Sequence, residues 1–182
     1  RLRMGTDGNG ISTLIAFYGC SLNCRYCINS QCKDKDTYRS NIIPEHLVEI
    51  LSVDDIYFSS TGGGVVFGGG EPLLQSTYIK EVCLKMPKHW AKRIETCLNV
   101  SWEKIELLIP YIDQWIIDIK DSNQDIYKNY TGVDGSIVYE NITRLSHLIG
   151  KDKILIRIPK IPDYNTEENV LLSDKVECLC TL

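Results

Sequence analysis

Short apolar segments alternate along this chain with longer segments whose apolar residues recur every three or four positions. The short segments predict β-strands, and the longer ones predict amphipathic helices. Strands are expected at residues 12–18, 64–67, 93–98, 115–119 and 153–158. Helices are expected between most of them, most clearly at residues 44–51, 77–86 and 138–149. Such strand–helix alternation is typical of a parallel sheet whose strands are joined by right-handed crossovers.

The periodicity leaves two architectures open, a doubly wound sheet and an open β/α barrel. In both, the carboxyl ends of the parallel strands form one ligand-binding face. Polar or cysteine-rich positions occur at the ends of the expected strands: Cys20, residues 68–71, Asn99, Asp118 and Lys120. We therefore expect segments that are far apart in the sequence to converge on a single site.

Three cysteines, Cys20, Cys24 and Cys27, fall within eight residues directly after the first expected strand. Thiolates grouped in this way bind zinc or iron–sulfur clusters. Structural zinc and ferredoxin-type clusters both require four ligands. No histidine lies in this loop, but Cys32 could act as a fourth thiol, so zinc and a four-cysteine cluster remain alternatives.

The other cysteines are expected to have simpler roles. Cys83 lies in an expected helix and Cys97 in an expected strand, where a free cysteine packs as a small apolar side chain. Cys178 and Cys180 lie near the end of the chain, where a second cluster formed with Cys32 is a further alternative.

Composition narrows the class of protein. The chain has 182 residues, of which 43% are hydrophobic and 24% charged, and this suits one folded domain over residues 1–182. A net charge of −4 argues against a nucleic-acid partner. We expect no membrane span and a cytoplasmic location, because we find no long apolar run and no secretion signal. In that setting eight cysteines favour metal binding or catalysis over disulfides.

Several short motifs occur in a fixed order. Residues 7–11 read Asp-Gly-Asn-Gly-Ile, and Tyr26 precedes the third cysteine of the triplet. A glycine-rich segment spans residues 62–72, residues 118–120 read Asp-Ile-Lys, and Arg157 follows an isoleucine. In this order and spacing the motifs resemble the glycyl radical enzyme activating enzymes of the pyruvate formate-lyase activating enzyme type, within the radical SAM superfamily. The resemblance covers nearly the whole chain.

The resemblance implies a fold and its cofactors. The implied fold is α/β, an open partial (β/α) barrel of parallel strands of the radical SAM type, apparently shortened at the C-terminus. The implied cofactors are a 4Fe–4S cluster held by Cys20, Cys24 and Cys27 and S-adenosylmethionine (SAM), for which the fourth iron is left open. The SAM-binding residues implied are Tyr26, Cys27, Ile28, Gly69, Gly70, Glu71, Asp118, Lys120 and Arg157.

Individual roles follow from the resemblance, and each has a structural alternative. Tyr26 would present its ring to the adenine, and residues 69–71 would meet the methionine amino group. Asp7 would face the substrate, although Asp and Gly are also common in ordinary turns. Arg157 would hold a carboxylate, or else form an ion pair within the protein. Asp118 and Lys120 would contact SAM, or else be a solvated strand end.

The resemblance also implies a reaction. SAM is cleaved reductively to methionine and a 5′-deoxyadenosyl radical, which removes a hydrogen atom from a backbone glycine of a partner enzyme. The implied partners are a glycyl radical enzyme as protein substrate and a flavodoxin- or ferredoxin-type electron donor. Two alternatives remain: a radical SAM enzyme that modifies a peptide or small molecule, and a non-enzymatic iron–sulfur or zinc module that uses Cys32 as a fourth ligand.

Overall fold

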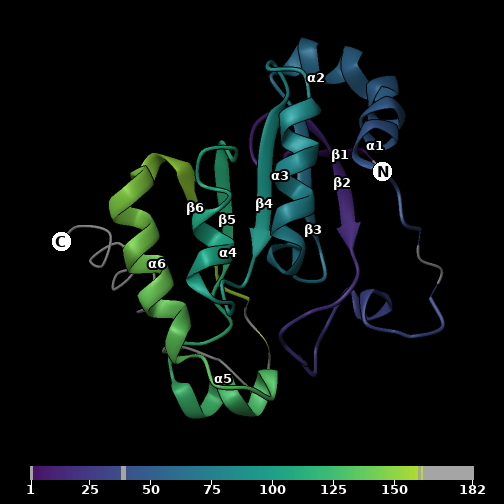
Figure 1. The fold of residues 1–182 in the computed structure, drawn as a ribbon. Coiled ribbons are helices and arrows are strands. Elements are labelled where there is room, and N and C mark those ends of the chain that lie inside the picture. Colours follow the sequence, from purple (N-terminus) through teal and green to yellow (C-terminus); the bar gives the residue numbers. More distant parts are fainter. Residues whose placement is uncertain (1, 38–39, 160, 162–182) are drawn as a thin grey trace.

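A six-stranded sheet forms the centre of the computed structural model, which describes residues 2–37, 40–159 and 161. The strands lie in the order β1-β2-β3-β4-β5-β6 (Figure 1). β1 is antiparallel to β2, and every later pair is parallel. The strands are β1 Leu2–Met4, β2 Ile11–Phe17, β3 Gly64–Gly69, β4 Ala91–Thr96, β5 Gln114–Asp118 and β6 Ile154–Arg157.

Six α-helices accompany the described strands. They are α1 Pro44–Leu51, α2 Asp55–Thr61, α3 Ser76–Lys85, α4 Trp102–Glu106, α5 Gln124–Thr131 and α6 Ser136–Ile149. Short 3₁₀ turns occupy Ser30–Cys32, Ser52–Asp54, Pro72–Gln75 and Lys151–Lys153. In Figure 1, α5 lies at the end of the molecule toward which β2 and β4 point. That end carries the carboxyl ends of the parallel strands.

The strand order confirms the open partial barrel. A doubly wound sheet reverses its strand order at a switch point, whereas β2 to β6 follow one another in sequence order, as in a barrel that has not closed. All five expected strands and the three clearest helices are present. The expected shortening and the pair Cys178 and Cys180 lie outside the described residues. The single domain over residues 1–182 stays a prediction.

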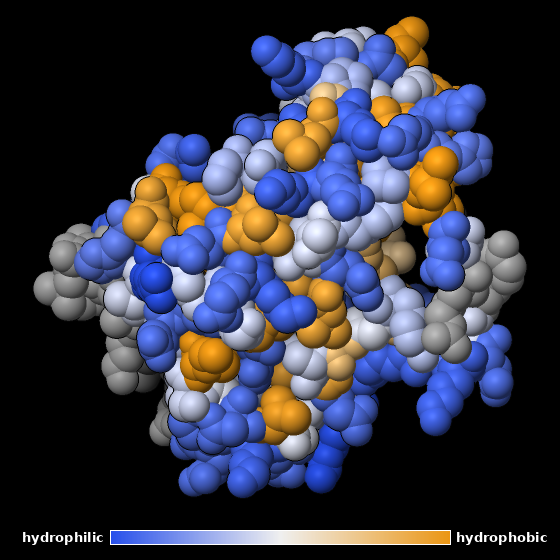
Figure 2. All heavy atoms as spheres, in the orientation of Figure 1, coloured by the Kyte–Doolittle hydropathy of each residue, from blue (hydrophilic) through white to orange (hydrophobic). Residues whose placement is uncertain are grey.

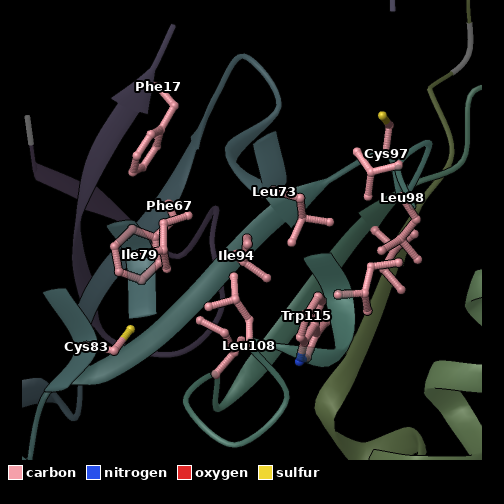
Figure 3. Close-up of a cluster of buried hydrophobic side chains, with 14 of the residues drawn as sticks. Phe17, Phe67, Leu73, Ile79, Cys83, Ile94, Cys97, Leu98, Leu108 and Trp115 are labelled. Carbon is pink, nitrogen blue, oxygen red and sulfur yellow. The ribbon is translucent and has the colours of Figure 1, made fainter. Parts of the chain in front are cut away.

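The inner strands are fixed by a continuous apolar core. Val65 and Phe67 of β3, Ile94 of β4 and Trp115 of β5 are fully buried and pack with Ile79 of α3 and other helical side chains. Figure 3 shows side chains of this cluster packed against the strands of the sheet. Burying one such side chain contributes about 1.5–3 kcal/mol, so the strands form a rigid support for the segments at their carboxyl ends.

The surface shown in Figure 2 is largely polar, with apolar residues in small scattered groups. Among the described residues, no helix has both the length and the apolar character needed to cross a bilayer.

Candidate active site

A cavity of about 890 Å³ opens at the carboxyl ends of the strands. Every residue proposed for the site from the sequence lines it: Asp7, Cys20, Cys24, Tyr26, Cys27, Ile28, Gly69, Gly70, Glu71, Asp118, Lys120 and Arg157. These residues come from five separate segments of the chain. The strand ends therefore converge on one site as expected, except that Gly68 and Asn99 are not among the lining residues. The Asn99 side chain instead donates to the Tyr127 hydroxyl and to Asp134 O.

The thiols of Cys20, Cys24 and Cys27 are partly buried in the cavity wall. Burial raises the pKa of the Cys20 and Cys24 thiols above the ordinary value. The amide of Leu22 donates to Cys20 Sγ at 3.4 Å. Hydrogen bonds of this kind support a metal-bound thiolate. Among the described residues, no three Cys, His, Asp or Glu side chains gather as they would around one metal ion.

Two further cysteines lie near the triplet. Cys32 is buried but does not belong to the residues that line the cavity. Cys97 is buried as expected, yet it also lines the cavity, and its Sγ donates to Glu71 Oε2 at 3.0 Å. Burial raises the pKa of Cys97 well above the ordinary value, so its thiol stays protonated. The cavity thus offers three candidate thiolate ligands and one neutral thiol.

The turn after β3 approaches the turn after β2 very closely. Gly70 N donates to Phe17 O at 2.9 Å, and Glu71 N donates to Gly19 O at 2.8 Å. A Cβ atom on Gly70 would lie only 2.1 Å from Gly19 O, and Gly69 has a φ of +89°. Only glycine allows this backbone contact, which holds the glycine turn against the start of the cysteine loop, residues 20–27.

The carboxylate of Glu71 is fully engaged by the protein. It accepts hydrogen bonds from Thr96 Oγ1 at 2.8 Å, from Leu73 N at 3.1 Å, and from the amide and thiol of Cys97, both at 3.0 Å. Four donors occupy its usual acceptor positions. Burial raises the pKa of Glu71, whose side chain ties the glycine turn to the end of β4. A ligand at residues 69–71 would therefore meet backbone groups.

Asp118 and Lys120 face one another, as their alternation along the chain predicts. Lys120 Nζ lies 3.1 Å from Asp118 Oδ2, and the Lys120 side chain is only 17% exposed. Burial alone would lower the pKa of Lys120, but the surrounding acidic groups, Asp118 foremost, together outweigh it and raise that pKa. The cavity wall therefore holds a permanent ammonium group beside a carboxylate, and both line the space that a ligand would occupy.

Arg157 belongs to a cluster of four charges. Its Nη1 donates to Glu95 Oε1 at 2.7 Å, and its Nη2 lies 3.4 Å from Asp7 Oδ1 and also donates to Thr6 O. Arg3 Nη1 lies 3.1 Å from Asp7 and 3.5 Å from Glu95. We call Arg3, Asp7, Glu95 and Arg157 the charge cluster. Arg157 therefore forms an ion pair within the protein, which was the structural alternative to its binding a ligand carboxylate. Arg157 nevertheless also lines the cavity.

Asp7 is the most enclosed member of the charge cluster, with 1% of its side chain exposed. Burial acts to raise its pKa, but hydrogen bonds and charge from Arg3 prevail, so the pKa of Asp7 is lowered. Its carboxylate is bound to arginines rather than open to the cavity mouth. Its role toward a substrate stays a prediction.

Tyr26 and Ile28 lie at the rim of the cavity, where 68% and 83% of each residue is exposed. Sequence reasoning did not assign Glu95 or Tyr130, which line the same cavity. The sequence signal for Glu95 was a carboxylate inside a mostly buried strand. Burying a carboxylate costs free energy unless the group is paired or lines a site. Nothing in the sequence singled out Tyr130.

The fold and the three-cysteine cavity are those of a radical SAM protein, and residues 14–174 match the sequence profile of the Radical SAM superfamily. The crystal structure of Streptococcus suis SuiB bound to S-adenosylmethionine superimposes with a TM-score of 0.68 over 94% of this chain and 38% of that one. At 15% identity this likeness concerns the fold alone.

Closer relatives are activating enzymes. The chain is 35% identical to the (2S)-3-sulfopropanediol dehydratase activating enzyme of Klebsiella oxytoca over 68% of its own length and 38% of that protein. It is 32% identical to the pyruvate formate-lyase-activating enzyme of Clostridium pasteurianum over 90% of its own length and 68% of that protein. The chain thus spans less than half of the first relative and about two thirds of the second. It belongs to the glycyl radical enzyme activating enzymes of the radical SAM superfamily.

Proteins of this superfamily use a 4Fe–4S cluster and SAM. The residues of the cavity fit both groups. Three thiols without a fourth thiolate suit a cluster that keeps one iron open, and the Leu22 amide already supports one of the sulfur atoms. The ammonium–carboxylate pair and the close-packed glycine turn offer charged and backbone groups to an amino acid ligand.

Proposed function

We propose that this chain cleaves SAM reductively at the cavity and directs the resulting 5′-deoxyadenosyl radical to a glycine of a partner enzyme. The observation that carries the proposal is the convergence of five separated segments on one cavity that holds three candidate thiolate ligands. Sequence similarity to activating enzymes supports a glycyl radical enzyme as the proposed partner.

In this proposal Cys20, Cys24 and Cys27 hold the cluster. When bound there, a reduced cluster supplies the electron that breaks a carbon–sulfur bond of SAM, giving methionine and the radical. The protein positions SAM and keeps water away from the reacting atoms. The protonated thiol of Cys97 and the position of Cys32 outside the cavity lining weigh against a non-enzymatic module with four thiolates.

Three parts of the cavity wall would orient SAM. The backbone of Gly69 and Gly70 would meet the methionine amino group, and Lys120 would hold a carboxylate or hydroxyl group by a charge-assisted hydrogen bond. Arg157 is already bound to Glu95, so a ligand carboxylate at Arg157 would share the guanidinium with Glu95. Tyr26 and Ile28 at the rim would cover the adenine.

The substrate side is proposed to lie at the loop between β1 and β2. Its Asp7 is held inward by Arg3 and Arg157, which supports a role in shaping the loop against an extended peptide. The proposed partners are a glycyl radical enzyme and a flavodoxin- or ferredoxin-type electron donor. The proposed setting is the anaerobic cytoplasm, where the radical and the reduced cluster would persist.

The test is transfer of the radical to a partner. The chain is loaded anaerobically with iron and sulfide, reduced, and mixed with SAM and a glycyl radical enzyme encoded beside it. We expect the EPR doublet of a glycyl radical, and no doublet when the target glycine of the partner is replaced by alanine. Abundant 5′-deoxyadenosine without a doublet from any candidate partner would contradict the glycyl target and favour a peptide or small molecule as substrate.

A further inference from the structure

The last turn of α5 lies directly against the cysteine loop. The final carbonyl groups of an α-helix have no amide partner within the helix. Here two of them accept from the cysteine loop: Asn23 N donates to Thr131 O at 2.8 Å, and Arg25 N donates to Tyr130 O at 3.0 Å. These two amides flank Cys24, so the backbone on both sides of this cysteine is fixed to α5.

The side chain of Tyr130 adds a third link. It is 4% exposed, and its hydroxyl donates to the carbonyl oxygen of Tyr26 at 3.1 Å. Tyr26 directly precedes Cys27, so this bond fixes the peptide that joins the two residues. A tyrosine hydroxyl is ordinarily protonated at neutral pH, so it can donate this bond.

The helix that provides these links is itself well anchored. The side chain of Asn123 caps its first turn by accepting from two following amides. The hydroxyl of the fully buried Thr131 donates back to Tyr127 O at 2.7 Å, and Gly132 ends the helix at a φ of 79°. α5 follows β5 within a few residues, so one segment presents Lys120 at its start and supports the cysteine loop at its end.

We propose that Tyr130 is a positioning residue for the cysteine loop: its hydroxyl holds the Tyr26 carbonyl and thereby fixes the orientation of Cys27 and the Tyr26 ring. The identity of the groups that these two side chains bind rests on the function proposed above. The fixing of the loop by α5 does not rest on that function, because its three hydrogen bonds join protein groups only.

The first arm of the test uses the full chain without iron. Tyr130→Phe removes the hydroxyl and keeps the ring. Tyr127→Phe is the matched control, because Tyr127 is in the same helix, is 1% exposed, and has a hydroxyl whose observed hydrogen bond is from Asn99 Nδ2 and not to the cysteine loop. Amide hydrogen exchange within residues 20–27 is expected to be about fivefold faster in Tyr130→Phe and unchanged in Tyr127→Phe. Thermal unfolding confirms that both variants are folded.

The second arm uses the chain loaded with iron and sulfide. Release of iron to a chelator is expected to be about fivefold faster in Tyr130→Phe than in wild type or Tyr127→Phe, because Cys27 is held less firmly. Unchanged exchange in Tyr130→Phe, or equal changes in both variants, would overturn the proposal. If the wild-type chain assembles no cluster, the function proposed above fails, while the exchange arm still decides whether Tyr130 fixes the loop.

Discussion

At the scale of single residues, the three thiols of the triplet differ from the thiol of Cys83 in where they lie. Cys20, Cys24 and Cys27 line the cavity, whereas Cys83 lies on the buried face of α3 in the hydrophobic core, where burial raises the pKa of its thiol to about 12. Burial alone therefore does not distinguish a ligand from a packing residue. The triplet is distinguished from Cys83 by the cavity beside each thiol. Cys97 also lines the cavity, but its thiol donates to Glu71.

Each cysteine of the triplet is expected to be essential for cluster assembly. Replacing Cys20, Cys24 or Cys27 by alanine removes one ligand, and bound iron and visible absorption after anaerobic loading should both be lost. Cys83→Ala is the matched control and should load iron as wild type does, at a stability cost of about 1 kcal/mol. A triplet variant that loads iron normally would contradict the assignment.

Lys120 and Asp118 should matter for SAM but not for the cluster. Removal of the buried ammonium by Lys120→Ala loses a charge-assisted hydrogen bond and is expected to weaken SAM binding by at least about tenfold. Asp118→Ala should act in the same direction, because it removes the carboxylate that lies 3.1 Å from Lys120 Nζ and helps to position it. Equilibrium binding to iron-loaded protein measures the effect, with the exposed Lys128→Ala as control. Unchanged affinity for SAM in both variants would contradict this prediction and indicate that Asp118 and Lys120 have only a structural role.

The sequence predicted the site residues that belong to recognisable motifs and missed those that depend on how strands are arranged. Cys20 was found because it belongs to the closely spaced cysteine triplet, and Lys120 because it belongs to the Asp-Ile-Lys motif at residues 118–120. Glu95 and Tyr130 were missed because only the fold decides that a strand residue and a helix residue face the same cavity. Glu71 was found, but its saturation by four donors could be known only from the structure.

At the scale of elements, the contact between the turns after β2 and β3 determines how the cysteine loop begins. Gly70→Ala would place a methyl group 2.1 Å from Gly19 O, which would force the two turns apart. We expect a loss of stability of about 3 kcal/mol or more and impaired cluster assembly. Chemical denaturation and iron content measure the two effects.

Gly62→Ala is the control for Gly70→Ala. Gly62 has a φ of +66° but open space around a Cβ atom. Alanine there should therefore lower the stability only through the left-handed backbone, by about 1–2 kcal/mol. It should leave cluster assembly intact. Equal effects of the two substitutions on iron content would contradict the role of the close contact.

The elements that sequence analysis missed have weak local signals. α5 contains Tyr127, Tyr130 and Thr131, which have modest helix propensity, and its cap and its packing on the cysteine loop support the helix. α2 is similarly short and rich in aromatic and hydroxyl residues. β1 has only three residues, which is too short for a periodic pattern, and its apolar residues Leu2 and Met4 are exposed. Tertiary contacts, rather than local sequence signals, therefore determine that α5, α2 and β1 form.

At the scale of the whole molecule, the charge cluster connects distant parts of the chain. Arg3 and Asp7 come from β1 and the following loop, Glu95 from β4 and Arg157 from β6. Their ion pairs connect the N-terminal segment to the far strand of the open sheet. The alternation of strands and helices predicted a parallel sheet, but periodicity could not choose between two architectures or predict this cluster.

Asp7→Asn should destabilise the protein by about 1–3 kcal/mol at pH 7, because a buried carboxylate bound to two arginines loses its charge. The pKa of Asp7 is lowered by folding, so its ionised form stabilises the fold above the ordinary value of 3.8, and this contribution is lost as the pH falls below it. The difference in unfolding free energy between wild type and variant should therefore shrink below about pH 4. The exposed Asp125→Asn is the control, and a pH-independent difference would contradict the assignment.

The central claim is that the cavity binds a cluster and uses it to cleave SAM, and the most direct measurement is the product of that cleavage. The chain is loaded with iron and sulfide under anaerobic conditions, reduced with dithionite and incubated with SAM, and the products are separated by chromatography. We predict equal amounts of methionine and 5′-deoxyadenosine, with neither formed without reductant or in Cys24→Ala. Iron-loaded, reduced protein that binds SAM but forms no 5′-deoxyadenosine would contradict the account.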